Sequence, residues 1–294
     1  MSSDLIMTRE IARLPERRPD AHKGDCGRIA VIGGCCGEVM MAGAPALTAI
    51  AAFRSGAGLV QVMVPEPLRG VVAVMAPHTT TRTLPTELPA LLDAVHDFQT
   101  DAVALGPGMG QSLATAVLMG FLQQFKGPIV VDADGLNVLA ATRPFDIPNP
   151  QRIVLTPHPG EIRRLLVARG KDRTIETTLA SRREAACALV EAFGCIAVLK
   201  GAGTIVTNGE RLYVNETGNA GMATGGTGDV LTGLIAGLIG QSMDPFEAAI
   251  LAVYLHGLAG DFAAEELGRR SMTVMDMIDY LPEAICDHEL SGAE

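Results

Sequence analysis

The sequence predicts an α/β protein, a three-layer α/β/α sandwich with a mostly parallel central sheet and an antiparallel hairpin at one edge. The first observation is that short apolar runs of strand length alternate with longer segments of helical length and apolar spacing. This alternation is typical of parallel strands joined by crossover helices. The second is the pair Asn208-Gly209 between two short apolar runs, which supplies the positive φ angles of a tight hairpin turn.

The predicted strands and helices follow the chain in order. Strands are expected at residues 28–32, 59–64, 101–105, 128–131, 152–155 and 195–199. Helices are expected at residues 44–55, 113–124, 160–168 and 178–193. Residues 203–207 and 210–214 are expected to form the hairpin. Because crossover helices pack on both faces of a parallel sheet, these segments define three layers.

The C-terminal quarter of the chain, residues 226–281, is predicted to be a layer of helices. Asp244-Pro245 marks the start of one helix there, because Asp is a common N-cap and Pro is favoured in the first turn. Ser271 or Thr273 begins the last helix. No linker, charge block or repeat divides the chain. We therefore expect one domain over residues 1–294, with residues 1–20 as a loose N-terminal arm.

Composition argues against several kinds of partner. The 294 residues carry 23 Lys and Arg against 33 Asp and Glu, whereas nucleic-acid binding needs clustered positive charge, so no nucleic-acid partner is expected. The longest uncharged run, 102–125, is broken at Gly106-Pro107 and is not predicted to cross a membrane. The six cysteines form no zinc-binding pattern and the first residues no secretory signal, which favours a cytoplasmic location.

A glycine-rich loop runs directly into an apolar helix at residues 219–231. Gly225, Gly226, Thr227 and Gly228 are expected to form an anion hole, because free N–H groups at a helix N-terminus attract phosphate. Asp229 follows them and is the candidate catalytic base, able to accept the proton of a hydroxyl that attacks phosphorus. A simpler alternative is that Thr227 or Asp229 only caps the helix.

Six further segments are candidate sequence motifs. They are residues 22–34, 54–60, 106–110, 132–137, 156–161 and 200–204. Together with the glycine-rich loop they resemble, in the same order, the motifs of the nucleotide-dependent NAD(P)H-hydrate dehydratases, a family of ribokinase-like enzymes. The resemblance covers about residues 20–282. Seven motifs in the same order are specific evidence for this family, whereas any one of them alone would be weak evidence.

This resemblance implies an activity and its partners. The activity is repair of the 6S hydrates of NADH and NADPH (NADHX and NADPHX) to the reduced cofactors. ADP or ATP would be the co-substrate and Mg²⁺ the cofactor, with ADP favoured because residues 156–161 look like the prokaryotic form. The resemblance also implies a homotetramer, and an NAD(P)H-hydrate epimerase on a separate chain as functional partner.

The resemblance assigns site residues as well. It places the adenylate at Lys200, Gly201, Ala202, Gly203 and Thr204, with Gly228 contributing. It places the hydrate at Ala44, Gly108, Gly110 and His158, beside Asp229. Taken as local sequence, residues 200–204 and 106–110 also suit structural turns at strand ends, and His158 also suits an exposed loop histidine without a role.

The pair Asp132 and Asp134 follows a predicted strand, and two carboxylates in a loop can hold Mg²⁺ through water. The alternative, equally supported, is that Asp134 caps a helix beginning near Leu136, so no direct metal ligand is assigned. The sequence departs from the family pattern at Cys35-Cys36 and Met40-Met41. Related chains carry small polar and aromatic residues there, which puts the wall of the nicotinamide pocket in question.

Two other functions fit the same loop. A ribokinase-like kinase acting on a hydroxymethylpyrimidine or hydroxyethylthiazole alcohol would use the same anion hole and acid. A nucleotide-binding sensor without catalysis would keep the loop but release no phosphate. Retention of both Asp229 and the glycines favours an enzyme over the sensor.

Overall fold

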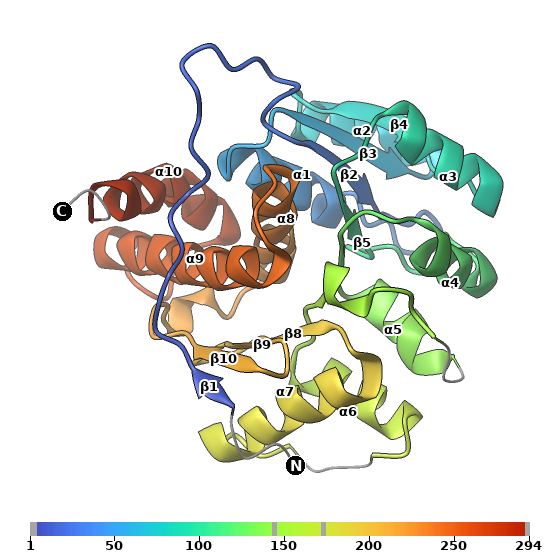
Figure 1. Cartoon of the computed structure of the whole chain (residues 1–294). Coiled ribbons are helices and arrows are strands. Elements are labelled where there is room, and N and C mark those ends of the chain that lie inside the picture. Colours follow the sequence, from blue (N-terminus) through green and yellow to red (C-terminus); the bar gives the residue numbers. More distant parts are fainter. Residues whose placement is uncertain (1–4, 143–145, 172–174, 292–294) are drawn as a thin grey trace.

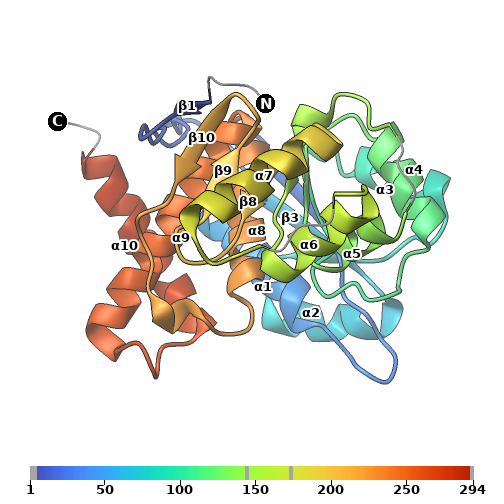
Figure 2. The ribbon, with the colours of Figure 1, turned by 90° about the horizontal axis from the view of Figure 1, so that it is seen from below.

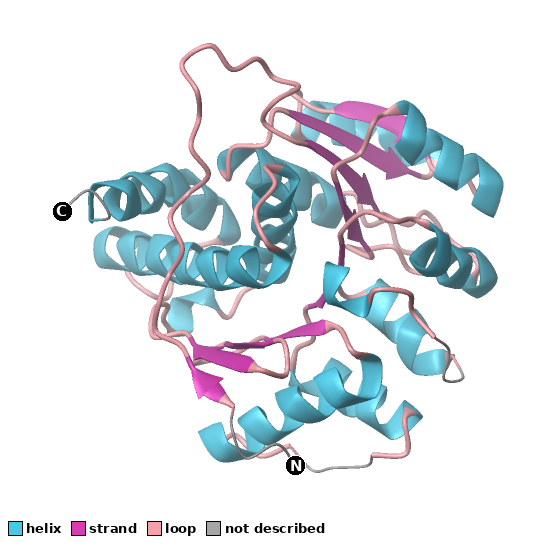
Figure 3. Cartoon of the chain, viewed as in Figure 1, coloured by secondary structure: helices cyan, strands magenta, loops and turns pink. Residues whose placement is uncertain are grey.

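The computed structural model describes residues 5–142, 146–171 and 175–291. Its strands are β1 (Ile6–Met7), β2 (Arg28–Ile32), β3 (Leu59–Val64), β4 (Thr80–Thr83), β5 (Ala102–Leu105), β6 (Ile129–Val131), β7 (Ile153–Leu155), β8 (Ile196–Leu199), β9 (Ile205–Thr207) and β10 (Arg211–Val214). Its α-helices are α1 (Gly43–Arg54), α2 (Arg69–Met75), α3 (Leu88–Asp97), α4 (Thr115–Gln124), α5 (Asp134–Ala141), α6 (Pro159–Ala168), α7 (Leu179–Phe193), α8 (Thr227–Gly240), α9 (Pro245–Leu267) and α10 (Val274–Ser291). Short 3₁₀ helices are η1 (Glu66–Leu68), η2 (Pro150–Arg152) and η3 (Ala220–Met222). Figure 3 shows helices on both sides of the strands.

The described strands form one sheet, in the order β1-β10-β9-β8-β7-β6-β5-β2-β3-β4. β9 runs antiparallel to both β8 and β10, and the other neighbouring strands are parallel. The order of connection reverses around β2, which lies between β5 and β3. Ligands of open α/β sheets bind beyond the carboxyl ends of the strands. A ligand site is therefore expected among the loops that follow strands β5 to β8.

The predicted sandwich is confirmed, including the mostly parallel sheet and the hairpin of β9 and β10. Each predicted strand and helix between residues 28 and 214 agrees with the structure to within two residues at either end. β4 was not predicted, because its residues are Thr and Arg rather than an apolar run. The last helix continues beyond the predicted end at residue 281 to Ser291, with Pro282 inside it.

The described part of the predicted N-terminal arm, residues 5–20, contains one short strand, β1; residues 1–4 lie outside the described residues. β1 pairs in parallel with β10 and becomes the outermost strand on that side. The N–H groups of Ile6 and Thr8 donate to the carbonyls of Glu210 and Leu212, each at 2.9 Å. The physical reason is that the open edge of β10 presents unpaired backbone groups that an extended arm can satisfy. Figure 2 shows β1 beside β10, with α3 and α4 toward the far side.

Alternate residues of each central strand face two separate cores, as the period of a strand requires. In β2, Ile29 and Val31 pack with α1, α2, α8, α9 and α10, whereas Ala30 and Ile32 pack with α3 to α7. Figure 1 shows α9 and α10 side by side on the first of these faces, across the sheet from α6 and α7. The two cores lie on opposite faces of the sheet, and each joins the sheet to one layer of helices.

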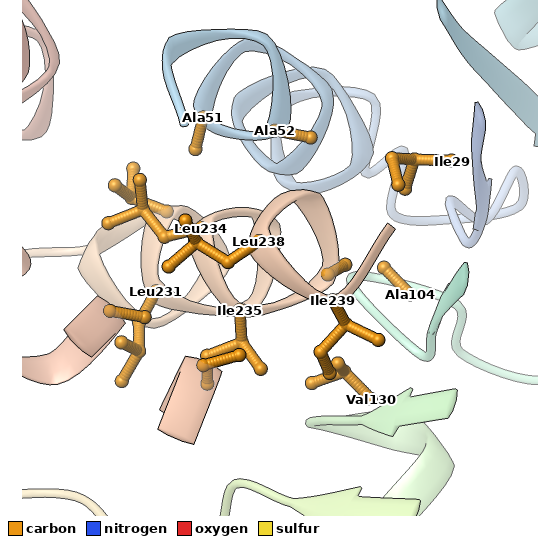
Figure 4. Close-up of a cluster of buried hydrophobic side chains, with 14 of the residues drawn as sticks. Ile29, Ala51, Ala52, Ala104, Val130, Leu231, Leu234, Ile235, Leu238 and Ile239 are labelled. Carbon is orange, nitrogen blue, oxygen red and sulfur yellow. The ribbon is translucent and has the colours of Figure 1, made fainter. Parts of the chain in front are cut away.

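Helix α8 is held at the centre of the first core, and its position fixes that of Asp229. The helix is buried from Val230 to Gly240. Leu234 and Leu238 lie toward α1, and Ile239 lies toward strands β5 and β6 (Figure 4). Two glycines permit the close approach to α1. A β-carbon at Gly233 would lie 2.1 Å from the carbonyl oxygen of Thr48, and one at Gly237 would lie 2.0 Å from Ser55 Oγ.

The predicted start of α9 is confirmed, because Asp244 caps it by accepting the N–H groups of Phe246 and Glu247 at 2.9 and 3.2 Å. Among the described residues, α9 is the one helix long and apolar enough to cross a membrane. However, 67% of its most apolar window is buried inside the molecule, which is the burial of a core helix.

Candidate active site

Two adjoining cavities lie at the carboxyl ends of β6, β7 and β8. The first, of about 500 Å³, lies between residues 200–204, residues 215–223 and α9. The second, of about 410 Å³, is lined by Asp132, Ala133, His158, Pro159, Glu161, Lys200, Gly201, Thr224, Gly226, Thr227, Gly228 and Asp229. Lys200, Gly201, Thr227 and Gly228 line both cavities, so a ligand in one reaches the other past these residues. We call them the first and the second cavity.

The N-terminus of α8 separates the two cavities. Gly226 is its N-cap, with a left-handed φ of 95°, and no side chain caps the helix. Thr227 Oγ1 donates instead to the carbonyl of Thr224 at 3.1 Å, so neither Thr227 nor Asp229 is the cap. The N–H groups of the first turn, at Thr227, Gly228 and Asp229, have no acceptor within the helix. They are the groups of this loop suited to hold a phosphate.

Asp229 lines the second cavity, and within the described part of the chain its carboxylate accepts no hydrogen bond. Burial and, to a lesser extent, the negative charge of Asp132 raise the pKa of Asp229 to about 7, against the opposing effect of the positive charge of Lys200. A carboxyl group with such a pKa exchanges protons efficiently near neutral pH. The environment of Asp229 is therefore that of a general base.

An ion pair lies beneath the first turn of α8. Asp132, directly after β6, is buried, and its Oδ1 accepts a hydrogen bond from Lys200 Nζ at 2.6 Å. Its Oδ2 accepts a second from Thr232 Oγ1 of α8 at 2.9 Å. A β-carbon at Gly228 would lie 3.2 Å from Lys200 Nζ. Lys200 thus directs its ammonium toward the start of α8. The resemblance predicted only that Lys200 contacts the adenylate.

The predicted adenylate residues lie together in the turn between β8 and β9. Lys200, Gly201, Ala202, Gly203 and Thr204 all line the first cavity, and Gly228 faces them. The opposite wall consists of residues 215–220, which are fastened to α9. There Asp261 accepts the N–H of Gly218 at 2.7 Å and the side-chain amide of Asn219 at 2.9 Å. This arrangement favours a ligand site over a plain turn.

His256 of α9 lines the first cavity and was not predicted as a site residue. Its Nε2 donates to the carbonyl of Thr227 at 2.9 Å, which fastens the first turn of α8. Burial and, to a lesser extent, the positive charge of Lys200 lower the pKa of His256 to about 4, against the opposing effect of its hydrogen bond to Thr227. The imidazole is therefore neutral at physiological pH. A single histidine in an otherwise apolar predicted helix was the signal available in the sequence.

His158 is the N-cap of α6 rather than a histidine without a role. Its Nδ1 accepts the N–H of Gly160 at 2.9 Å, and the backbone N–H of His158 donates to Glu161 Oε2 at 2.8 Å. These two bonds form a reciprocal capping box. The Nε2 lies 3.4 Å from Glu161 Oε1. Burial raises the pKa of Glu161, and both side chains line the second cavity.

The remaining predicted substrate residues lie elsewhere. β-carbons at Gly108 and Gly110 would lie 3.0 Å from the β-carbons of Ala44 and Cys35, respectively, so these residues are close together beneath the loop at 35–41. None of them lines either cavity. Gly225 is exposed and also lines neither. Their predicted roles in binding remain predictions.

The interpretation of Asp134 as a cap needs correction. Helix α5 begins at Asp134 itself, and Ala133 precedes it with an unusual φ of 48°. The Asp134 carboxylate accepts the N–H of Gly110 at 2.8 Å and the side-chain amide of Asn137 at 3.2 Å. Its oxygens thus fasten the turn at residues 106–110. Across the described residues, no group of three His, Cys, Asp or Glu side chains could hold a metal ion.

The fold and the two cavities define a ribokinase-like protein. A profile of the NAD(P)H-hydrate dehydratases matches residues 29–283. The chain belongs to this family.

Proteins of known name agree with this assignment. The chain is 41% identical over 281 residues to the bifunctional NAD(P)H-hydrate repair enzyme Nnr of Moorella thermoacetica, covering 92% of this chain and 51% of that protein. It is 37% identical to the Escherichia coli enzyme of the same name, covering 92% and 50%. The chain thus spans about half the length of these curated relatives.

A solved structure resembles the chain over nearly its whole length. It is the ADP/ATP-dependent NAD(P)H-hydrate dehydratase of Bacillus subtilis, co-crystallised with ATP and Mg²⁺. The TM-score is 0.78 at 29% identity, covering 94% of this chain and 95% of that chain. The fold and the family that the sequence motifs predicted are confirmed.

Proposed function

We propose that this chain dehydrates the 6S hydrates of NADH and NADPH to the reduced cofactors, at the expense of ADP. The observation that carries the proposal is the position of Asp229. It is a partly buried acid with a pKa near 7 that lies beside the free N–H groups of a helix N-terminus. The family assignment and the names of the relatives support the substrate.

In the proposed reaction, the C6 hydroxyl oxygen of the hydrate attacks the β-phosphorus of ADP. The bond from that phosphorus to the bridging oxygen breaks, AMP leaves, and Asp229 accepts the hydroxyl proton. N–H groups of Thr227 and Gly228 hold the negative charge on the transferring phosphoryl group. The C6–O bond then breaks as the ring nitrogen donates its electron pair, phosphate departs, and loss of the C5 proton restores the ring double bond.

The positions of the two cavities suit two ligands. ADP would occupy the first cavity, with its phosphates extending past Lys200 and Gly228, and the hydrate would occupy the second, next to Asp229 and His158. The Lys200 ammonium lies where both ligands meet. A fixed positive charge there offsets the charge that develops on the phosphoryl group.

Magnesium fits this chemistry, since Mg²⁺ is usually bound through substrate phosphates, waters and one or two carboxylates. Asp132 and Glu161 are the carboxylates that line the second cavity beside Asp229. Because both already accept hydrogen bonds from the protein, they would hold the ion through its water ligands. When bound, Mg²⁺ would supply positive charge to the phosphates. A homotetramer, a cytoplasmic location and an epimerase on a separate chain stay predictions.

The test is to incubate hydrated NADH with the protein, Mg²⁺ and either ADP or ATP. We expect the dihydronicotinamide absorbance to return, with one phosphate and one AMP released per NADH when ADP is used. A stable phosphorylated alcohol without released phosphate would indicate a kinase instead. Nucleotide binding in calorimetry without phosphate release would indicate a sensor.

A further inference from the structure

A buried arginine lies behind the turn that lines the first cavity. Arg182 belongs to α7, and its side chain is almost fully buried, at 7% exposure. Its Nη1 donates to the carbonyl of Ala202. Its Nη2 lies 3.3 Å from the carbonyl oxygen of Leu199 and 3.5 Å from that of Lys200. One guanidinium therefore contacts the carbonyl groups of three residues within 199–202.

The charge of Arg182 is costly where it lies. Within the described residues no carboxylate forms an ion pair with it, and burial lowers its pKa. A buried charge without an ionic partner costs free energy, and an apolar side chain of similar volume commonly stabilises a fold as well or better. Stability alone thus does not account for an arginine at this position.

The contacts of Arg182 determine which way the peptide groups of the turn face. In a trans peptide the carbonyl of one residue and the N–H of the next point in opposite directions. Because the carbonyls of Lys200 and Ala202 face Arg182, the N–H groups of Gly201 and Gly203 face away from it. In the described chain neither N–H donates a hydrogen bond, and both glycines line the first cavity.

We propose that Arg182 is a positioning residue for nucleotide binding. By holding these carbonyls, it aims the N–H groups of Gly201 and Gly203 at the phosphate of the nucleotide that is not transferred. This inference rests on the proposed use of a nucleotide. Two oriented N–H groups form a concave site for an anion, and Gly201 and Gly203 permit it with φ angles of 134° and 63°.

Calorimetric titration of the full chain with AMP and with adenosine tests this role, because only AMP carries the phosphate. We expect Arg182→Met to weaken AMP binding at least tenfold and adenosine binding less than threefold. Arg182→Lys, which keeps the charge but cannot reach three carbonyls in one plane, should lie between. The matched control is Arg183→Met on the same helix, which should bind both ligands as the wild type does.

Steady-state turnover provides a second measurement. A purely structural role of Arg182 would not change the KM for one substrate alone. Arg182→Lys should raise KM for ADP severalfold and leave KM for the hydrate unchanged. Equal loss of AMP and adenosine affinity, or no loss in either variant, would overturn the role of Arg182. If Arg182→Met does not fold, Arg182→Lys decides. A wild-type chain that binds neither AMP nor ADP would instead refute the proposed function.

Discussion

Lys200 Nζ lies 2.6 Å from Asp132 Oδ1, directly beneath the first turn of α8. This ion pair joins the ends of β6 and β8, which are separated by β7 in the sheet. It brings a positive charge to the N–H groups at Gly228 and a negative charge near Asp229. Both charges influence the acid that we assign as the base.

Substituting Lys200 by Met should impair phosphoryl transfer more than nucleotide binding. The variant removes the charge that offsets the transferring phosphoryl group, and we expect kcat to fall by about 10²–10³. It also removes the group that lowers the pKa of Asp229, so the acidic limb of the rate profile should move to higher pH. Lys126→Met, at an exposed position, is the control. Unchanged kcat in Lys200→Met would exclude the proposed role.

The pH dependence of kcat/KM should report the ionisation of Asp229. The base acts in its deprotonated form, so kcat/KM should rise about tenfold per pH unit below pH 7 and level off above it. Asp132→Asn removes a negative charge that raises this pKa, so the rise of kcat/KM in this variant should lie at lower pH. A wild-type profile that is flat from pH 5 to 8 would contradict the assignment.

Close packing of α8 on α1 should make Gly233 intolerant of any side chain. A β-carbon there would meet the backbone carbonyl of Thr48 at 2.1 Å, which the helices can relieve only by moving apart. We expect Gly233→Ala to lower the free energy of unfolding by about 2–4 kcal/mol. Gly70→Ala in α2 meets nothing within 4 Å and should be neutral or slightly stabilising. Urea titration of both variants checks this; equal stabilities would refute the packing argument.

His256 should make the protein sensitive to acid. Its folded-state pKa of about 4 lies below the ordinary value of 6.5, so the unfolded chain binds the proton more readily. The free energy of unfolding should therefore fall between about pH 6.5 and pH 4, by about 2–3 kcal/mol from this residue. His256→Gln should lose most of that dependence, whereas exposed His96→Gln should keep it. Identical pH dependence in all three proteins would contradict this interpretation.

The fold and the position of Asp229 at the start of a helix could be predicted from the sequence, because the apolar runs, the Asn-Gly turn and the glycine loop are local patterns. Asp229 lies in the first turn of α8 as expected. The contacts of Asp132, Lys200 and Thr232 could not be predicted, because they join residues up to 100 positions apart. The pairing of Ile6–Met7 with β10 could not be predicted for a similar reason, since β10 lies about 200 residues away.

The most direct test of the account is single-turnover phosphate release by Asp229→Asn with ADP, Mg²⁺ and hydrated NADH. The account predicts ADP binding within threefold of the wild type and a rate lower by about 10²–10⁴, the usual contribution of a general base. At pH 8 the variant should melt at a temperature no lower than the wild type, because the raised pKa of Asp229 means that its charged form disfavours folding above about pH 7. A correctly folded Asp229→Asn protein that releases phosphate at the wild-type rate would contradict the central claim.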